Sequence, residues 1–246
     1  NSGSNGNCYY IGNEKEAVLI DAGISCRETE KRMKRLGLPM EKVKAIFITH
    51  EHVDHIRGAE VLSKKHRLPV YITEPTWRNS RFIPDPTLSE SFIAGFPVVV
   101  GDLMITPFQK SHDASDPHSF TVTNGKTTVG VFTDLGYACQ NLELHLSQCH
   151  AAFLESNYDE RMLETGRYPV YLKRRIRSDK GHLSNDQALE VFLKRRSADL
   201  QLVILSHLSA ENNHPQVVHD LFSHHANGVK IAVASRYEET GVFQVE

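Results

Sequence analysis

Six consecutive residues hold the densest group of metal-binding side chains in the chain. They read His50-Glu51-His52-Val53-Asp54-His55 and directly follow the apolar run 45–49. A β-branched and aromatic run of this kind is typical of a buried strand, so its end would place these side chains at the rim of a sheet. In an extended loop His50 and His52 can converge on one cation, while Asp54 and His55 can serve a second. Imidazole nitrogens and carboxylate oxygens are ligands for zinc, and also for manganese and iron.

Three further candidate ligands each follow a predicted strand. They are His112, Asp134 and His207. Each one alone is more typical of a structural residue, and a His-rich tract can be an incidental metal binder. Donors at separate strand ends are nevertheless what a site on one rim of a sheet sandwich requires, so together they favour ligation. His118 competes with His112, which we prefer because it follows its strand sooner.

The order His-x-His-x-Asp-His resembles the signature of the metallo-β-lactamase-fold hydrolases. The resemblance implies a mixed α/β fold, a four-layer αβ/βα sandwich, with two divalent ions in one site. One ion would take His50, His52 and His112, and the other would take Asp54, His55 and His207, with Asp134 bridging them. Asp21, in Asp21-Ala22-Gly23, would brace the metal loop through hydrogen bonds, although it could equally cap the next turn. His118 would be a neighbour of the site rather than a ligand.

Two such ions, about 3.5–4 Å apart, acidify a shared water and stabilise charge that develops on the attacked oxygen. We therefore expect a bridged hydroxide to attack an ester, with Asp54 and Asp134 in the catalytic set. Zinc is the first expectation, with manganese and iron as alternatives.

His182 is the candidate for assisting the leaving group. It lies in Gly181-His182-Leu183-Ser184-Asn185, upstream of His207. In the ribonuclease Z-like phosphodiesterases, which this stretch resembles, a non-ligand histidine at a similar place helps the departing alkoxide, a poor leaving group that needs an acid. The alternative is a plain helix entry with Ser184 as the N-cap, and both can hold.

Several stretches resemble the YycJ-type (WalJ-type) subgroup of bacterial proteins over nearly the whole chain. They are residues 2–10, 111–114, 155–159, 181–185 and 207–213. This resemblance implies a cytoplasmic metal-dependent nuclease, an exonuclease on DNA, with Asn212 among the substrate contacts. His118 departs from the small residue expected there, which leaves less room beside the site.

Length, composition and charge limit the number of domains and the ways in which the chain could bind nucleic acid. The 246 residues, 40% of them apolar, suffice for one large domain over 1–246. With 28 basic and 30 acidic residues, global basicity does not indicate nucleic acid, so such binding needs a local patch. Lys173, Arg174, Arg175 and Arg177, beside Tyr168 and Tyr171, could hold phosphates and stack bases, or could be a solvated helix face.

Cysteine use and hydropathy bear on the compartment. The four cysteines form neither a C-x-x-C pair nor a disulfide framework, which fits a reducing, cytoplasmic setting. Apolar runs stay below transmembrane length and a signal peptide is not visible, so no membrane association is expected. The sequence does not predict an oligomeric state.

The elements that must position these residues alternate between hairpins and helices. Strands are expected at 8–11, 17–20, 68–72, 151–155 and 202–205, and hairpins at 96–106, with its turn at 101–102, and at 120–132, with its turn at 124–125. Helices are expected at 25–36, 56–65, 184–196 and 215–222. The first two strands predict an antiparallel start, and the order fits two packed sheets with helices outside. Residues 73–95 have no clear assignment.

Two other functions compete with the nuclease. A thioester or lactone hydrolase on the same scaffold would show a narrow apolar pocket lined by Phe side chains and Trp77. A non-catalytic nucleic-acid-binding protein with structural metal would show a site closed by four protein ligands.

Overall fold

The computed structural model describes residues 1–83 and 85–246, and these form two compact units. Unit 1 consists of Asn1–Gln109, Ala114–Lys126 and Ser235–Gln244, and unit 2 of Lys110–Asp113, Thr127–Ala234 and Val245–Glu246. The prediction of a single domain over 1–246 stays a prediction. Among the described residues, no helix has the length and apolar character needed to cross a bilayer.

Unit 1 contains a five-stranded sheet. Its order is β1 (Tyr9–Gly12), β2 (Ala17–Ile20), β3 (Val43–Phe47), β4 (Val70–Tyr71) and β5 (Ser89–Glu90). The first pair is antiparallel, as predicted, and the remaining pairs are parallel. Every side chain of β2 is buried, because both faces of this part of the sheet are covered.

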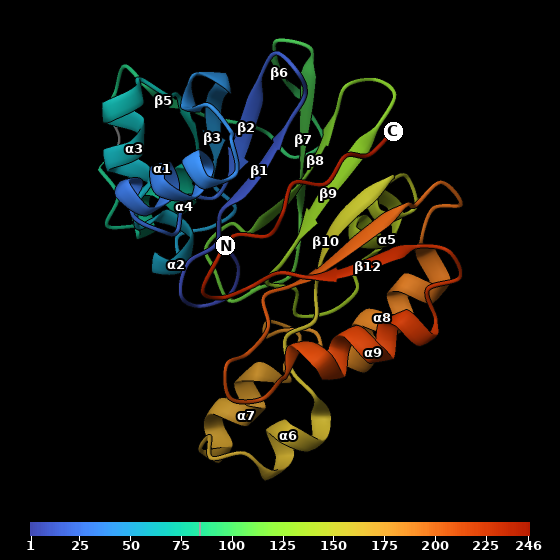
Figure 1. Cartoon of the computed structure of the whole chain (residues 1–246). Coiled ribbons are helices and arrows are strands. Elements are labelled where there is room, and N and C mark those ends of the chain that lie inside the picture. Colours follow the sequence, from blue (N-terminus) through green and yellow to red (C-terminus); the bar gives the residue numbers. More distant parts are fainter. Residues whose placement is uncertain (84) are drawn as a thin grey trace. The chain divides into compact units, whose positions relative to one another are not determined.

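The helices α1 (Cys26–Arg35) and α3 (Ala59–His66) cover one face of this sheet (Figure 1). The single helix predicted from residue 56 is wrong in its start, because the chain forms α2 (Val53–Ile56) and then breaks before α3. The break has a tertiary cause. The Gly58 N–H donates to the Ala22 carbonyl at 2.8 Å, and a Cβ on Gly58 would lie 1.9 Å from the Ile24 oxygen.

Unit 1 also contains an antiparallel group of three strands. They are β6 (Val98–Val100), β7 (Leu103–Gln109) and β8 (His118–Thr123). Phe120 on β8 packs edge-on against Phe47 on β3, with ring centroids 5.6 Å apart.

Short elements of unit 1 also lie in segments that the sequence did not assign. The segment 73–95 contains α4 (Glu74–Asn79) and β5. A 3-10 turn, Met40–Lys42, precedes β3.

Unit 2 contains four parallel strands in the order β9 (Thr128–Phe132), β10 (Ala151–Glu155), β11 (Leu202–Ser206) and β12 (Lys230–Val233). Parallel pairing brings the carboxyl ends of neighbouring strands to one edge of the sheet. Asp134, Glu155 and His207 lie at or just after three of these ends. The topology of unit 2 therefore brings these three side chains to one edge of the sheet.

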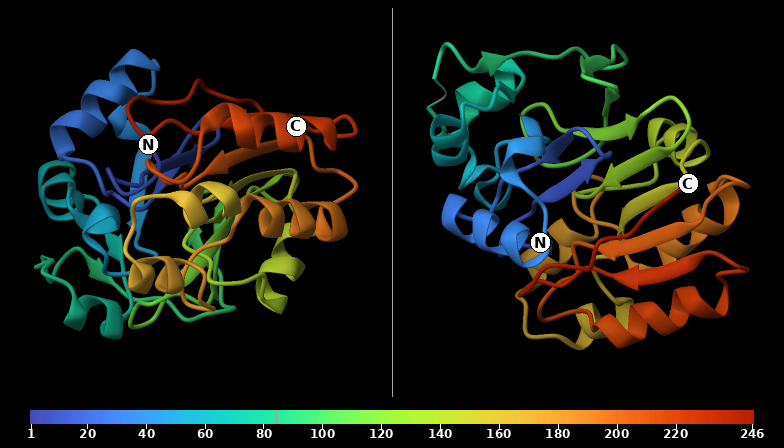
Figure 2. Two further views of the ribbon diagram at one scale, coloured as in Figure 1. Left: turned by 90° about the horizontal axis from the view of Figure 1, so that it is seen from below. Right: turned by 45° about the horizontal axis from the view of Figure 1, so that its top comes forward.

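The helices α5 (Gln140–Leu146), α8 (Asn185–Arg195) and α9 (Pro215–His224) pack on this sheet (Figure 2). Ser184 is the N-cap of α8, as the sequence predicts, and the structure adds a capping box in which Gln187 takes part. Phe192 and Phe222 join α8 to α9 with ring centroids 5.4 Å apart. In Figure 1, α6 (Glu160–Thr165) and α7 (Val170–Ile176) project from the strands of unit 2 around a small core of their own.

Candidate metal centre

The histidine-rich loop of unit 1 follows β3 and leads into α2. His50 is fully buried, and its Nε2 lies 3.0 Å from Nδ1 of His52. His52 is the N-cap residue of α2, so the extended backbone before the helix brings both rings together. The structure therefore juxtaposes the two imidazoles that the sequence assigns to one cation.

Asp21 braces this loop from the end of β2. Its Oδ1 accepts from the Thr49 backbone N–H (2.8 Å), and its Oδ2 accepts from the Thr49 hydroxyl (2.9 Å) and from Nδ1–H of His55 (2.6 Å). Asp21 is buried and has a positive φ of 60°, a conformation that costs energy and persists where surrounding contacts hold it. Because Asp21 accepts from Nδ1, the lone pair of the His55 ring lies on Nε2.

Asn7 is a residue of this loop's environment that the sequence reasoning missed. Its Nδ2 lies 3.0 Å from Nε2 of His55 and 3.3 Å from Oδ2 of Asp54. The other end of the amide is fixed, because Oδ1 accepts from the Gly3 N–H (2.8 Å) and the Tyr9 hydroxyl (3.1 Å). Asn7 therefore orients both candidate ligands of the second cation. The sequence offered little indication of this role, because the pair Gly6-Asn7 is also typical of an ordinary turn.

Gly23 lets the backbone of this loop approach closely, and its replacement gives a testable prediction. A Cβ at Gly23 would lie 1.7 Å from the Asp54 carbonyl oxygen. We expect Gly23→Ala to displace Asp54 and to destabilise the protein by about 2–4 kcal/mol, measured by urea denaturation. Gly241→Ala is the matched control, since a Cβ there meets nothing within 4 Å. Equal stability of the two variants would contradict the prediction.

In unit 2, Asp134 lies among three imidazoles. Its Oδ1 is 3.4 Å from Nε2 of His207, 3.6 Å from Nε2 of His112 and 3.9 Å from Nδ1 of His182. Asp134 and His207 both have a φ of 56° where the chain leaves β9 and β11. The strained turns aim these two side chains at the same place above the sheet edge.

Glu155, the last residue of β10, is the main member of this cluster that the sequence reasoning missed. Its Oε1 accepts from Nδ1–H of His182 (2.8 Å) and Nδ1–H of His207 (3.1 Å), and its Oε2 accepts from the Leu135 N–H (2.6 Å). Burial raises the pKa of Glu155, but the charges and hydrogen bonds of His182 and His207 outweigh it and hold the pKa at about 2. The sequence offered one indication of its role, which is its position. Glu155 is a carboxylate at the end of an apolar strand, just as Asp134 follows a different apolar strand.

His112 lies on the short segment Lys110–Asp113 of unit 2. Its Nδ1–H donates to the Gly181 carbonyl at 3.1 Å. Burial lowers the pKa of His112 to about 3, so the ring is neutral at physiological pH. A neutral imidazole with its proton on Nδ1 presents the Nε2 lone pair that a metal ion needs.

The donor set fits divalent metal ions. Ligating histidines in proteins donate their second ring N–H to a carboxylate or a backbone carbonyl. His55 does so to Asp21, His112 to Gly181 and His207 to Glu155. Within unit 2, ligand atoms of Asp134, Glu155, His182 and His207 lie within 4.8 Å of one another. Both clusters therefore present donors that suit a divalent metal ion.

His118 begins β8 in unit 1, whereas His112 belongs to unit 2. The His118 ring is buried, its Nδ1–H donates to the Asp116 carbonyl at 2.9 Å, and it packs edge-on against Phe92. Its predicted place beside the site stays a prediction.

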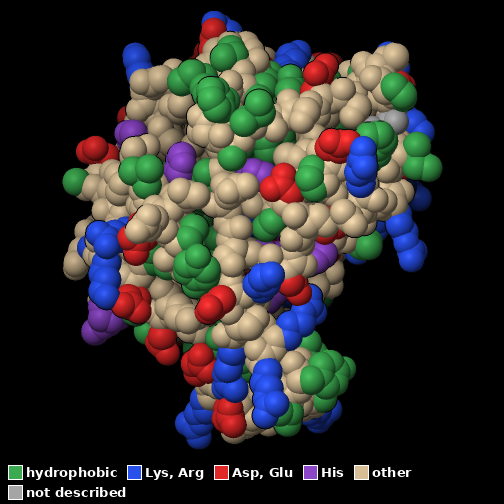
Figure 3. Space-filling model, turned by 180° about the vertical axis from the view of Figure 1, so that it is seen from behind, with side chains coloured by type: hydrophobic (Ala, Val, Ile, Leu, Met, Phe, Trp, Pro, Cys, Tyr) green, Lys and Arg blue, Asp and Glu red, His purple; other side chains and the backbone are tan. Residues whose placement is uncertain are grey.

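The predicted substrate-binding cations lie on α7 and its C-cap. Figure 3 shows Lys and Arg side chains gathered over the lobe that α6 and α7 form. Arg175 pairs with Asp113 at 2.5 Å, and Arg177 pairs with Glu160 and Glu164. Lys173 donates to the Glu164 carbonyl at 2.6 Å, while Arg174 is exposed. Intramolecular pairs thus occupy part of the basic patch.

Asn212 is not exposed in the way that a substrate contact would be. Its side chain is fully buried. Its backbone carbonyl accepts from the Asp159 N–H at 2.8 Å and so holds the start of α6. Substrate binding by Asn212 stays a prediction.

Residues 2–170 match the model of the metallo-β-lactamase superfamily. The chain belongs to this superfamily, and the fold predicted from the sequence is confirmed.

Two relatives indicate a subgroup within this superfamily. The exodeoxyribonuclease YycJ of Bacillus anthracis is 37% identical over 86% of this chain and 81% of the relative. The exodeoxyribonuclease WalJ of Streptococcus pneumoniae (strain D39) is 34% identical over 89% of this chain and 83% of the relative. The resemblance to the YycJ-type (WalJ-type) subgroup that the sequence indicated is thereby confirmed.

Among solved structures, the metallo-β-lactamase fold protein YhfI from Bacillus subtilis aligns over 96% of this chain and 90% of its own, with a TM-score of 0.71 and 18% identity. Human tRNase Z, short form, aligns over 98% of this chain and 93% of its own, with a TM-score of 0.65 and 14% identity. At these identities the likeness concerns the fold.

Proposed function

We propose that the protein is a metal-dependent hydrolase of phosphodiester bonds, and specifically an exonuclease on DNA. The observation that carries this proposal is that two relatives named exodeoxyribonuclease match most of this chain and most of their own length. The two histidine–carboxylate clusters support it, because their tautomers suit metal ligation.

The ligand assignment is part of the proposal. One ion would take His50, His52 and His112, the other Asp54, His55 and His207, with Asp134 shared. Zinc is the first expectation from imidazole and carboxylate donors, with manganese or iron as alternatives. Such ions, when bound, lower the pKa of a water and stabilise charge that develops on the phosphoryl oxygens.

The protein's own residues would orient the metal-binding imidazoles and protonate the leaving group. Asp21 and Glu155 hold their imidazoles in one tautomer through Nδ1, which fixes the direction of each ring. Glu155 also accepts from Nδ1–H of His182, so Nε2 of His182 can hold the proton that the departing sugar oxygen requires. A general acid at this point suits a phosphodiester, whose alkoxide is a poor leaving group.

A matched set of substrates tests the function. End-labelled linear duplex DNA, the same DNA as a closed circle, RNA of the same sequence and a thioester are incubated with protein and zinc or manganese. We expect release of nucleotides from the linear DNA alone, and loss of this activity after chelation with restoration by added metal. Cleavage of only the thioester would support the alternative of an acyl hydrolase. Nicking of the circle at the same rate would rule out the exonuclease specificity.

We also propose a cytoplasmic location, on cysteine chemistry. Within residues 1–83 and 85–246 all four cysteines are free thiols, which suits a reducing compartment.

A further inference from the structure

A second set of metal-binding side chains lies where α1 meets α3 in unit 1. Cys26 and Glu30 are one turn apart on α1, and His66 is the last residue of α3. Oε1 of Glu30 lies 3.7 Å from Sγ of Cys26 and 2.7 Å from Nε2 of His66. The three ligand atoms all lie within 4.8 Å of one another. None of these residues belongs to the clusters proposed for hydrolysis.

We propose that Cys26, Glu30 and His66 form a separate site for a divalent ion of the zinc class. Thiolate, carboxylate and imidazole are all zinc ligands, with bonds of about 2.3 Å to sulfur and about 2.0 Å to nitrogen and oxygen. Tetrahedral angles then place sulfur and oxygen about 3.5 Å apart, and nitrogen and oxygen about 3.3 Å apart. The first pair already fits, and the second must open from its present hydrogen bond.

The side chains have the freedom that this adjustment needs. Those of Glu30 and His66 are 27% and 23% exposed, so the site is reachable from solvent while Cys26 is buried. Water would complete the coordination. This open position distinguishes the site from a closed structural zinc site with four protein ligands.

The helix ends favour the charges that such a site requires. Cys26 is the first residue of α1, where the helix N-terminus stabilises a thiolate. His66 closes α3, and the carbonyls of a helix C-terminus favour a cation. In the absence of an ion, burial and then Glu30 raise the pKa of the Cys26 thiol. Binding therefore breaks the S–H bond, releases one proton to solvent and forms a metal–sulfur bond without any change of oxidation state.

Lys65 is the competitor for this position. Its Nζ lies 2.6 Å from Oε1 of Glu30, and its side chain is 56% exposed. Exposed ion pairs of this kind contribute little stability, so an ion that also gains a thiolate and an imidazole would displace the ammonium. The bound ion would then join α1 to α3.

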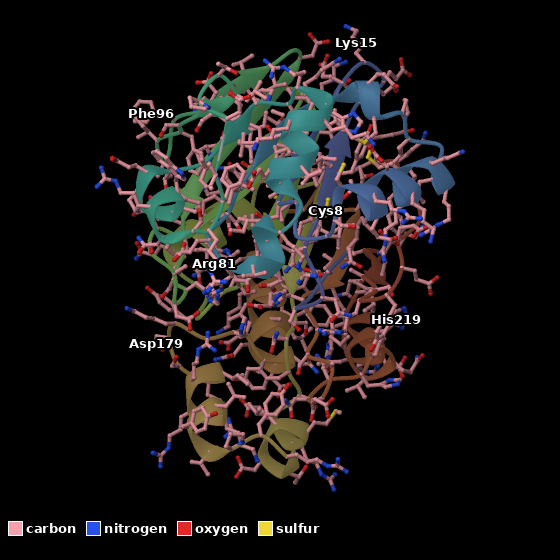
Figure 4. The ribbon with its side chains drawn as sticks, turned by 90° about the vertical axis from the view of Figure 1, so that its left-hand side faces the viewer. Cys8, Lys15, Arg81, Phe96, Asp179 and His219 are labelled. Carbon is pink, nitrogen blue, oxygen red and sulfur yellow. The ribbon has the colours of Figure 1, made fainter. Side chains whose placement is uncertain are left out.

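Thiolate absorption isolates this site from the hydrolytic one. None of the seven ligands proposed for hydrolysis carries sulfur, so a sulfur-to-metal charge-transfer band on titration with Co²⁺ or Cd²⁺ reports a cysteine ligand. We expect a band that saturates at one thiolate-bound ion per chain. It should vanish in Cys26→Ser and persist in Cys8→Ser, which removes the half-buried cysteine beside β1 (Figure 4).

Two variants that keep the thiol complete the test. Glu30→Gln and His66→Gln are expected to weaken the affinity read from the band at least about tenfold. No band in the wild-type protein would overturn the proposal, as would a band that survives Cys26→Ser. The result is independent of the exonuclease assay, because it is read from the absorption spectrum rather than from DNA cleavage.

Discussion

Asp134→Asn is expected to lower kcat/KM on end-labelled duplex DNA at least about a thousandfold. Asp134 lies among His112, His182 and His207 and is the residue proposed to contact both ions. The amide removes its negative charge and turns an N–H₂ group toward the metal position. We therefore expect metal content, measured by mass spectrometry, to fall from about two ions per chain to one or fewer.

The substitution separates chemistry from folding. Asp134 has a φ of 56°, and asparagine tolerates this left-handed conformation as well as aspartate does, so the variant should keep the wild-type circular dichroism spectrum. Asp199→Asn, at an exposed carboxylate of the same unit, is the control and should retain full activity. Activity of Asp134→Asn within tenfold of the wild type would remove Asp134 from the metal centre.

The candidate residues that the sequence could name are those with a local pattern. Asp134 and His207 could be named as candidates because each follows an apolar run, and parallel strands bring such ends to one edge of unit 2. The N-cap Ser184 could be named because a serine directly before an apolar helical pattern is typical of a helix start, and the structure places Ser184 at the N-cap of α8.

What the sequence could not predict depends on contacts between distant residues. Asn7 contacts His55 across 48 positions, and Glu155 contacts His207 across 52, and neither pair has a local signature. The break between α2 and α3 escaped prediction for the same reason, since Gly58 is required by the Ala22 and Ile24 carbonyls. A carboxylate that ends a strand can be a ligand or a brace for a ligand, and only the fold decides between these roles.

His182→Ala is expected to lower kcat on DNA by about 10²–10⁴-fold while metal content stays at the wild-type value. The reason is that His182, held by Glu155 through Nδ1 at 2.8 Å, is proposed to protonate the leaving group and not to bind metal. Its ring centroid lies 5.2 Å from those of both His112 and His207, so a cavity there leaves the proposed ligands their own hydrogen bonds. KM should change little, since the interaction belongs to the transition state.

The identity of the leaving group distinguishes an acid from a structural histidine. The leaving group of a p-nitrophenyl phosphodiester is p-nitrophenolate, which departs without protonation. The His182→Ala variant should therefore cleave this substrate at close to the wild-type rate while remaining impaired on DNA. Glu155→Gln should behave differently. Because Glu155 holds both His182 and His207, its loss should reduce metal content and slow both substrates. Equal impairment of His182→Ala on the two substrates would mean that His182 shapes the site without donating a proton, and the role of general acid would then pass to another residue or to water.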